Sequence, residues 1–253
     1  MDRSGNGVWD GCDVDLCLDS FGSAEDVPVI GKSKRNPASQ IGAFNRTRGI
    51  WYLDSNGNGK WDGCGIDTCI DSFGRSGDFP VSRQVSGLDQ SIIGIFTPET
   101  TTQVNRRTVT QKGVWQFDRN GNGQLDSCSI DECYQGFGSA GDLPVVGDWK
   151  GTGTEYLGIY RFSTGQWFLD YNGNGKLERC KQDGCLGPFG TPEDLPVVGD
   201  WDGSGKTQIG IFRPSTGEWF LDLNGNGIWD GCAIDICIES FGEEGDLPVA
   251  GKW

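Results

Sequence analysis

Short runs of β-branched and aromatic residues alternate along the chain with Gly, Pro, Asp and Asn. Runs such as "IGIF", "EWFLD" and "LPVVGDW" have four to seven residues, and no apolar stripe follows the 3.6-residue helical period. Apolar runs of this length, bounded by turn-forming residues, are typical of β-strands. The pattern therefore predicts an all-β protein.

The chain repeats itself, and three sequence signatures mark the repeat. A loop rich in Gly and Asn begins at Asp2, Asp54, Asp118, Asp170 and Asp222. These starting points lie 52 residues apart, with one interval of 64. A run similar to "DLPVVGDW" follows each loop, whereas the hairpin pattern "IGIFRPSTGEWFLD" occurs only four times.

The repeats predict one domain over residues 1–253, with its core strung along the units. The five loop units lie near residues 2–31, 54–82, 118–147, 170–199 and 222–253. The four hairpins lie near residues 41–54, 93–118, 158–170 and 209–222. The chain is therefore not a set of five complete repeats.

Polar residues occupy fixed places in every loop. Counted from the leading Asp, each loop has an acid at positions 1 and 9, side-chain oxygens at positions 3 and 5, and Gly at position 6. A calcium loop needs oxygens at positions 1, 3 and 5, a backbone carbonyl at 7 and a further ligand at 9, with Gly at 6 for the sharp turn. We therefore expect about five Ca²⁺ ions; tight "NGNG" turns without metal are the alternative.

Position 14 also carries an acid in every loop, and it is either a further ligand or the cap of a turn. The predicted ligands of the first three loops are Asp2, Ser4, Asn6, Val8, Asp10, Asp15, Asp54, Asn56, Asn58, Lys60, Asp62, Asp67, Asp118, Asn120, Asn122, Gln124, Asp126 and Asp131. Those of the last two loops are Asp170, Asn172, Asn174, Lys176, Glu178, Asp183, Asp222, Asn224, Asn226, Ile228, Asp230 and Asp235. Position 7 is included for its backbone carbonyl.

The charge of the chain is concentrated in these loops. Three acids in each of five loops account for fifteen of the 36 acids, and the other 21 equal the 21 Lys and Arg residues in number. The formal net charge of −15 therefore belongs to the proposed sites. Without cations the carboxylates within a loop would repel one another.

Every loop also contains two cysteines in the spacing Cys-x4-Cys. The pairs are Cys12/Cys17, Cys64/Cys69, Cys128/Cys133, Cys180/Cys185 and Cys232/Cys237. Ten cysteines with a local partner each predict five disulfides and an oxidising compartment. Zinc held by thiolates is the weaker alternative, because zinc sites usually have Cys-x2-Cys spacing and the chain has no His. We expect an extracellular or cell-surface protein, although no signal peptide is visible in this chain.

The stretch "PVVGDWDGSGKTQIGIFRPSTGEWFLD" resembles the FG-GAP/VCBS repeats of bacterial secreted proteins, which are related to the β-propeller of integrin α-subunits. The loop "DLNGNGIWDGC" is similar to the calcium loops of thrombospondin type 3 repeats. The resemblance covers most of the chain and implies four-stranded blades with a role in adhesion or ligand binding. The family's usual calcium loop, between the first and second strands, is degraded here and implies ligation only weakly, at Asp200 and Asp202.

This resemblance predicts a β-propeller-like fold of about five blades, with a linear β-solenoid-like array as the alternative. Because four hairpins cannot complete five blades, the propeller is expected to be incomplete or open. Three arrangements fit: a fragment of a longer array, an incomplete propeller with a protected gap, or copies joined head to tail. From the sequence we favour an open or polymerising arrangement.

The expected function is structural or adhesive. His is absent and the recurrent carboxylates are assigned to cations, so we expect no enzyme activity. Other copies of the chain, joined head to tail, are the first candidate partners; the alternative is a propeller that binds a surface glycan or protein. So acidic a chain is not expected to bind nucleic acid. No apolar run approaches the eighteen residues of a membrane span.

Overall fold

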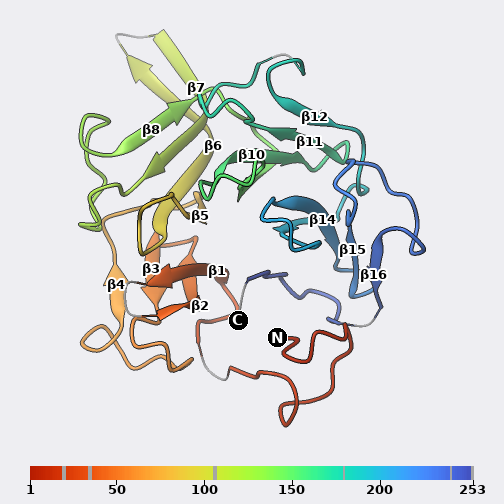
Figure 1. The fold of residues 1–253 in the computed structure, drawn as a ribbon. Helices are drawn as coiled ribbons and strands as arrows, with labels where there is room; N and C mark the ends of the chain where they lie inside the picture. The colour runs from red at the N-terminus through yellow and green to blue at the C-terminus, as the bar shows by residue number, and fades with distance from the viewer. Residues whose placement is uncertain (19–20, 34–35, 105–106, 179, 240, 252–253) are drawn as a thin grey trace.

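The computed structural model describes residues 1–18, 21–33, 36–104, 107–178, 180–239 and 241–251. Sixteen strands in these ranges form four antiparallel sheets of four strands, which lie in a ring as the blades of a β-propeller (Figure 1). The all-β propeller prediction is thus confirmed, and the solenoid-like alternative does not describe this chain. Within the described ranges, no helix is long and apolar enough to cross a membrane.

In each blade the strands follow one another in chain order. Blade 1 contains β1 (Asp26–Ser33), β2 (Asn36–Asn45), β3 (Ile50–Leu53) and β4 (Thr68–Ile70). Blade 2 contains β5 (Phe79–Arg83), β6 (Ile92–Val104), β7 (Arg107–Phe117) and β8 (Glu132–Gln135). Blade 3 contains β9 (Asp142–Gly147), β10 (Tyr156–Arg161), β11 (Gln166–Leu169) and β12 (Gly184–Leu186). Blade 4 contains β13 (Leu195–Gly199), β14 (Gln208–Arg213), β15 (Glu218–Leu221) and β16 (Ile236–Ile238).

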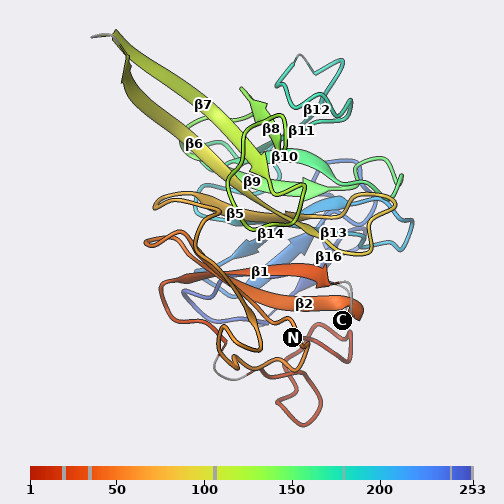
Figure 2. The ribbon, with the colours of Figure 1, turned by 90° about the vertical axis from the view of Figure 1, so that its left-hand side faces the viewer.

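The long interval of 64 residues is explained by one hairpin. β6 and β7 continue their antiparallel pairing from Gly94 and Phe117 out to Val104 and Arg107. The added residues therefore extend an existing ladder, and the hairpin projects from the ring (Figure 2).

Neighbouring blades share their apolar cores. Ile95 of β6 packs in the cluster of blade 1 around Phe44 and Trp51, and Ile159 of β10 packs in the cluster of blade 2 around Phe96. These side chains are almost completely buried, which is the condition under which apolar burial stabilises most. The blades are thus held to one another by the second strand of the following blade.

Hydrogen bonds from backbone to side chain join the blades beside a central cavity. Near the end of the first strand of a blade, a backbone N–H donates to a side chain that precedes the second strand of the next blade. The three donor–acceptor pairs are Lys32 N with Ser91 Oγ (2.8 Å), Gln84 N with Glu155 Oε2 (2.6 Å), and Asp148 N with Thr207 Oγ1 (2.9 Å). The cavity has a volume of about 780 Å³, and residues of β1, β5, β9 and β13 line it together with Val249 to Gly251.

Both ends of the described chain lie in a fifth position of the ring, side by side in two views (Figures 1 and 2). Residues 246–251 repeat the sequence of an innermost strand, and Gly251 lies against Ile30 of blade 1. At the other end, Gly7 lies against Ile238 of blade 4. Neither end segment is paired into a sheet. The described residues therefore form four complete blades and part of a fifth position, which agrees with the expected incomplete propeller of about five blades.

Candidate metal-binding loops

Each Gly/Asn-rich loop packs against the preceding unit, at an outermost strand in four of the five contacts and at Leu18 in the other. The Gly at position 6 meets a large apolar side chain there; the pairs are Gly7/Ile238, Gly59/Leu18, Gly123/Ile70, Gly175/Tyr134 and Gly227/Leu186. At Gly227 the φ angle is +75°, and a Cβ would lie 2.8 Å from Leu186 Cδ2. Only Gly suits such a place, because it tolerates positive φ and leaves room for the neighbour.

The carboxylate at position 1 organises the turn. In the last loop, Asp222 is only 1% exposed; its Oδ1 accepts the N–H of Asn226 at 3.2 Å and its Oδ2 accepts the N–H of Gly227 at 2.7 Å. The equivalent Asp54, Asp118 and Asp170 make the same pair of bonds and are also buried. Asp2 accepts N–H groups from positions 4 and 6 of the first loop.

Positions 3, 5 and 9 converge at the exposed side of the loop. The side-chain amides of Asn224 and Asn226 both donate to Asp230 Oδ2, at 2.9 and 2.7 Å. The second, third and fourth loops repeat this arrangement around Asp62, Asp126 and Glu178. In the first loop Asn6 donates to Asp10, whereas Ser4 turns to Asp2. Three of the predicted ligand side chains thus meet at one point in four loops.

The position 7 residues contribute through their backbone. The N–H of Val8, Lys60, Gln124, Lys176 and Ile228 donates to the amide oxygen of the Asn at position 5. The use of their carbonyls as metal ligands stays a prediction.

The acid at position 14 closes the loop. Asp235 Oδ2 accepts the N–H of Asp230 at 2.8 Å, and its Oδ1 accepts the N–H of Leu223 at 3.1 Å. Asp15, Asp67, Asp131 and Asp183 likewise accept the N–H at position 9, and all five are buried. Of the two roles suggested by the sequence, the structure has the turn cap; ligation by this residue stays a prediction.

Burial and hydrogen bonding act in opposite directions on the two kinds of carboxylate. Desolvation raises the pKa of Asp170 and Asp222 at position 1, since burial penalises their charged form. At position 9 the pKa of Asp62 and Asp230 is lowered, because the two Asn amides donate to the ionised carboxylate. In the last loop, burial thus disfavours the charged form of Asp222, whereas hydrogen bonding favours the charged form of Asp230.

The residues present suit a hard cation by chemistry. Two carboxylates, two amides and a backbone carbonyl form an all-oxygen set of the kind that Ca²⁺ prefers. Binding would require the amides at positions 3 and 5 to turn so that their oxygens replace the N–H groups now facing position 9. Within the described residues, no three Cys, His, Asp or Glu side chains are grouped so as to hold a metal ion. The third acid of each loop is directed at backbone N–H groups instead.

The predicted disulfides are confirmed. Each Cys-x4-Cys pair is bonded within its own loop, and none of the ten cysteines is free. A short cross-link of this kind stabilises by about 2 kcal/mol on the chain-entropy model. In blades 1 to 4 it ties position 11 of the loop to the outermost strand of the blade.

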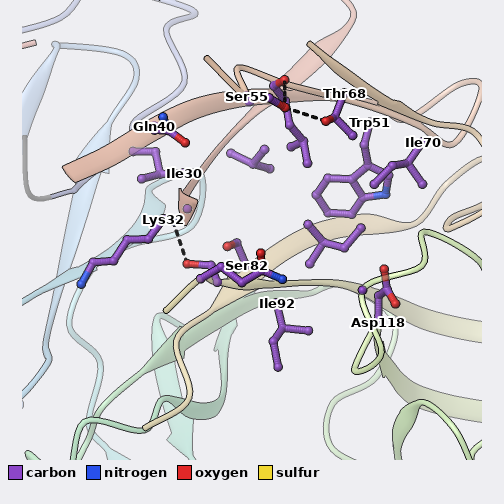
Figure 3. A pocket seen from close by; sticks show the side chains of 18 of the residues that line it. Ile30, Lys32, Gln40, Trp51, Ser55, Thr68, Ile70, Ser82, Ile92 and Asp118 are labelled. Carbon is purple, nitrogen blue, oxygen red and sulfur yellow. Dashed lines mark hydrogen bonds between the residues drawn. The ribbon is translucent and has the colours of Figure 1, made fainter. Parts of the chain in front are cut away.

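A pocket of about 530 Å³ lies between blades 1 and 2. Figure 3 shows Gln40 and Lys32 toward one side of it, and Trp51 and Ile70 toward the other. Gln40 is 9% exposed, and its Nε2 atom has no hydrogen-bond partner within the described part of the chain. A buried amide without a partner is unusual and favours a polar ligand or water at this place.

Comparison of the chain with protein-family models, with curated proteins and with solved structures finds no match. The sequence-based interpretation missed that the loops join neighbouring blades. The signal was present, because an apolar residue stands at position 17 of every unit: Leu18, Ile70, Tyr134, Leu186 and Ile238.

Proposed function

We propose that this protein is an extracellular β-propeller, stabilised by calcium and stapled by disulfides, with a structural or adhesive role. The observation that carries the proposal is the convergence of positions 3, 5 and 9 in loops that are wedged between blades. In the last loop, for example, Asn224, Asn226 and Asp230 meet at one point, while Gly227 presses on Leu186 of blade 3.

An ion in such a loop would act on the contact between blades. It would neutralise the exposed acid at position 9 and the buried acid at position 1, and so offset both repulsion and desolvation. Five divalent ions would reduce the formal charge of −15 to about −5. Carboxylate oxygens have several lone pairs, so the acid at position 1 can bind an ion and still accept backbone N–H groups.

The extracellular part of the proposal rests on the disulfides and on calcium supply. Five local disulfides persist in oxidising compartments. Calcium loops of extracellular modules bind with dissociation constants of about 0.1–1 mM, which suits the millimolar calcium outside cells. The resemblance to FG-GAP/VCBS repeats agrees with an adhesive role.

Thermal unfolding with and without calcium tests the proposal. At ten times the dissociation constant, each site adds about 1.4 kcal/mol to the free energy of unfolding by mass action. We expect the melting temperature to fall markedly when a chelator replaces 5 mM calcium, and magnesium to restore little of it. An identical melting curve in chelator and in calcium would refute the stabilising role.

The pocket between blades 1 and 2 supports a second candidate function, the binding of a small polar ligand such as a sugar. Its volume is within the range of small-molecule sites, and the unpartnered Gln40 amide could orient a hydroxyl group. Titration with a panel of monosaccharides, monitored by calorimetry, tests this. Gln40→Ala should abolish any heat of binding; saturating heat that survives the substitution would place the site elsewhere.

A further inference from the structure

In blade 3 a tryptophan ring covers the glycines of the first two strands. A Cβ added at Gly147 or at Gly158 would lie 2.5 or 2.9 Å from the ring of Trp149, which is only 7% exposed. The indole N–H donates to Leu157 O at 3.0 Å. The two glycines therefore leave the room that an indole ring needs at this place.

Blade 4 has the same arrangement with a side-chain amide beside it. Trp201 lies against Gly199, and its indole N–H donates to Ile209 O at 3.0 Å. Gln208 accepts the backbone N–H of Trp201 at 2.7 Å through Oε1 and donates to Asp202 Oδ1 at 2.6 Å through Nε2. The amide is therefore satisfied by the backbone of the tryptophan and by a carboxylate one residue further along.

Blade 1 has the same framework without the tryptophan. Gly31 pairs with Gln40 in the register in which Gly199 pairs with Gln208 in blade 4. The sequence has Ser33 at the place of the tryptophan, and β1 and β2 continue to pair up to this residue. The tryptophan that blades 3 and 4 have here is therefore replaced in blade 1.

The pocket of about 530 Å³ between blades 1 and 2 lies at this place. Gly31 and Gly42, which correspond to the two glycines under Trp149, both line it. Val29 and Leu53 line it as well, and they correspond to the Val and Leu that surround the second glycine of blade 3. The pocket thus has the walls of an indole site, and its volume is in the range of small-molecule sites.

Two polar groups that line the pocket have bonding capacity left. Gln40 is 9% exposed and its Nε2 has no partner within the described residues, whereas the equivalent Gln208 uses both ends of its amide (Figure 3). Ile41 O accepts the N–H of Asp54 at 3.2 Å, while the equivalent carbonyls of blades 3 and 4 accept an indole N–H as well. An amide donor and a carbonyl lone pair at so buried a place favour a ligand with the complementary groups.

Blade 2 also lacks the tryptophan, but its own side chains fill the place. Phe117 stands where blade 1 has Leu53, and it is the side chain that a Cβ at Gly94 would meet first. Arg83 stands where the other blades have glycine, and its guanidinium lies 4.3 Å from the centroid of the Phe117 ring. The place is thus filled from within in each of the other three blades.

We propose that the pocket between blades 1 and 2 binds an indole ring that carries a carboxylate or amide oxygen on a short side chain. The ring would lie over Gly31 and Gly42, and its N–H would donate to Ile41 O. The oxygen of the side chain would accept from Gln40 Nε2, as the carboxylate of the polar loop does in blade 4. This inference narrows the second candidate function, a small ligand in this pocket, and rests on it. It does not depend on calcium in the loops.

Calorimetric titration of the full chain with indoleacetate and with indole tests the proposal. We expect one molecule per chain, with a dissociation constant of about 1 mM or lower for indoleacetate, which suits a ligand of this size. Gln40→Ala should weaken indoleacetate about tenfold and indole not at all, since only the carboxylate accepts from the amide. Gln208→Ala is the matched control in blade 4 and should leave both affinities unchanged.

A second variant blocks the pocket itself. Leu53→Phe introduces the residue that blade 2 has and should abolish binding of both compounds, while its melting temperature shows that it is folded. Heat that survives Leu53→Phe in the folded variant, or no heat with the parent chain, would overturn the proposal. Heat from a monosaccharide but from neither indole compound would keep the pocket as a binding site and overturn this ligand.

A blocked Trp-Asp dipeptide distinguishes the two sources of such a ring. Tighter binding of the dipeptide than of indoleacetate would assign the ring to a polypeptide, and weaker binding would assign it to a free indole acid. These titrations do not depend on how calcium changes the melting temperature, so failure of the calcium proposal and failure of this one are distinguishable.

Discussion

At the scale of single residues, neighbouring positions of the repeat have different structural roles. The two glycines of an "NGNG" turn illustrate this. Gly225 and Gly227 both have positive φ, but an added Cβ would lie 3.5 Å from Gln208 at the first and 2.8 Å from Leu186 at the second. The first glycine therefore serves only the turn, and the second also serves the packing of one blade on another.

Gly227→Ala should consequently destabilise the protein more than Gly225→Ala. Both variants share the strain of an Ala in the left-handed region, about 1–2 kcal/mol. Only Gly227→Ala adds the cost of overpacking, about 1–3 kcal/mol. Denaturant unfolding of the two variants in calcium measures the difference. Equal free energies of unfolding would contradict the close contact of Gly227 with Leu186.

Glu155 is a second residue whose surroundings change its chemistry. It is half-buried beside the central cavity, where its Oε2 accepts the N–H of Gln84. Desolvation raises its pKa to about 7, with a further rise from Asp148, while the hydrogen bond from Gln84 and the charges of Lys32 and Arg83 lower it. The central cavity thus has beside it a carboxyl group whose pKa lies near neutral pH.

Glu155→Gln should change how stability depends on pH. Below the unfolded pKa of 4.5 the carboxyl of Glu155 is neutral in the folded and in the unfolded protein. The variant and the parent should then have similar free energies of unfolding. As the pH rises from 4.5 to about 7, only the unfolded state releases the proton, and the parent should lose roughly 3 kcal/mol relative to the variant. Denaturant unfolding at pH 4 and pH 8 tests this, with the exposed Glu244→Gln as control. A difference that is the same at both pH values would contradict the burial effect.

At the scale of elements, the sequence predicted the strands and disulfides well because local signals specify them. Runs such as "IGIF" and "EWFL" form β14 and β15, and the cysteine spacing favoured the local link that the structure has. The packing of the loops could not be predicted in the same way. Gly59 and Leu18 are far apart in sequence, and their contact exists only because the first and second units are neighbours in a ring.

The calcium site of one loop should be separable from the fold. Asp222→Ala with Asp230→Ala removes both acids of the last loop and should reduce the number of bound ions by one. The matched control in the same blade is Asp200→Ala with Asp202→Ala, which alters the degraded family loop and should leave that number unchanged. Native mass spectrometry in calcium counts the ions directly. Loss of an ion only in the control would contradict the prediction, because calcium would then bind at Asp200 and Asp202 and not in the Gly/Asn-rich loop.

At the scale of the whole molecule, each end of the described chain contacts a blade of the ring: Gly7 lies against Ile238 of blade 4, and Gly251 against Ile30 of blade 1. The sequence favoured an open or polymerising arrangement, because a missing hairpin suggested two bare ends. In the structure Gly7 and Trp9 find on blade 4 the contacts that other loops find on their own neighbours. Head-to-tail joining of copies would have to compete with this contact within one chain, and it stays a prediction.

The central claim is that the loops between the blades bind calcium, and calorimetric titration of the calcium-free protein tests it most directly. The account predicts saturable uptake of about five ions per chain, with dissociation constants of about 0.1–1 mM and one ion fewer in the variant with Asp222→Ala and Asp230→Ala. No uptake at millimolar calcium, or uptake unaffected by that variant, would contradict it and leave the loops as turns held by hydrogen bonds alone.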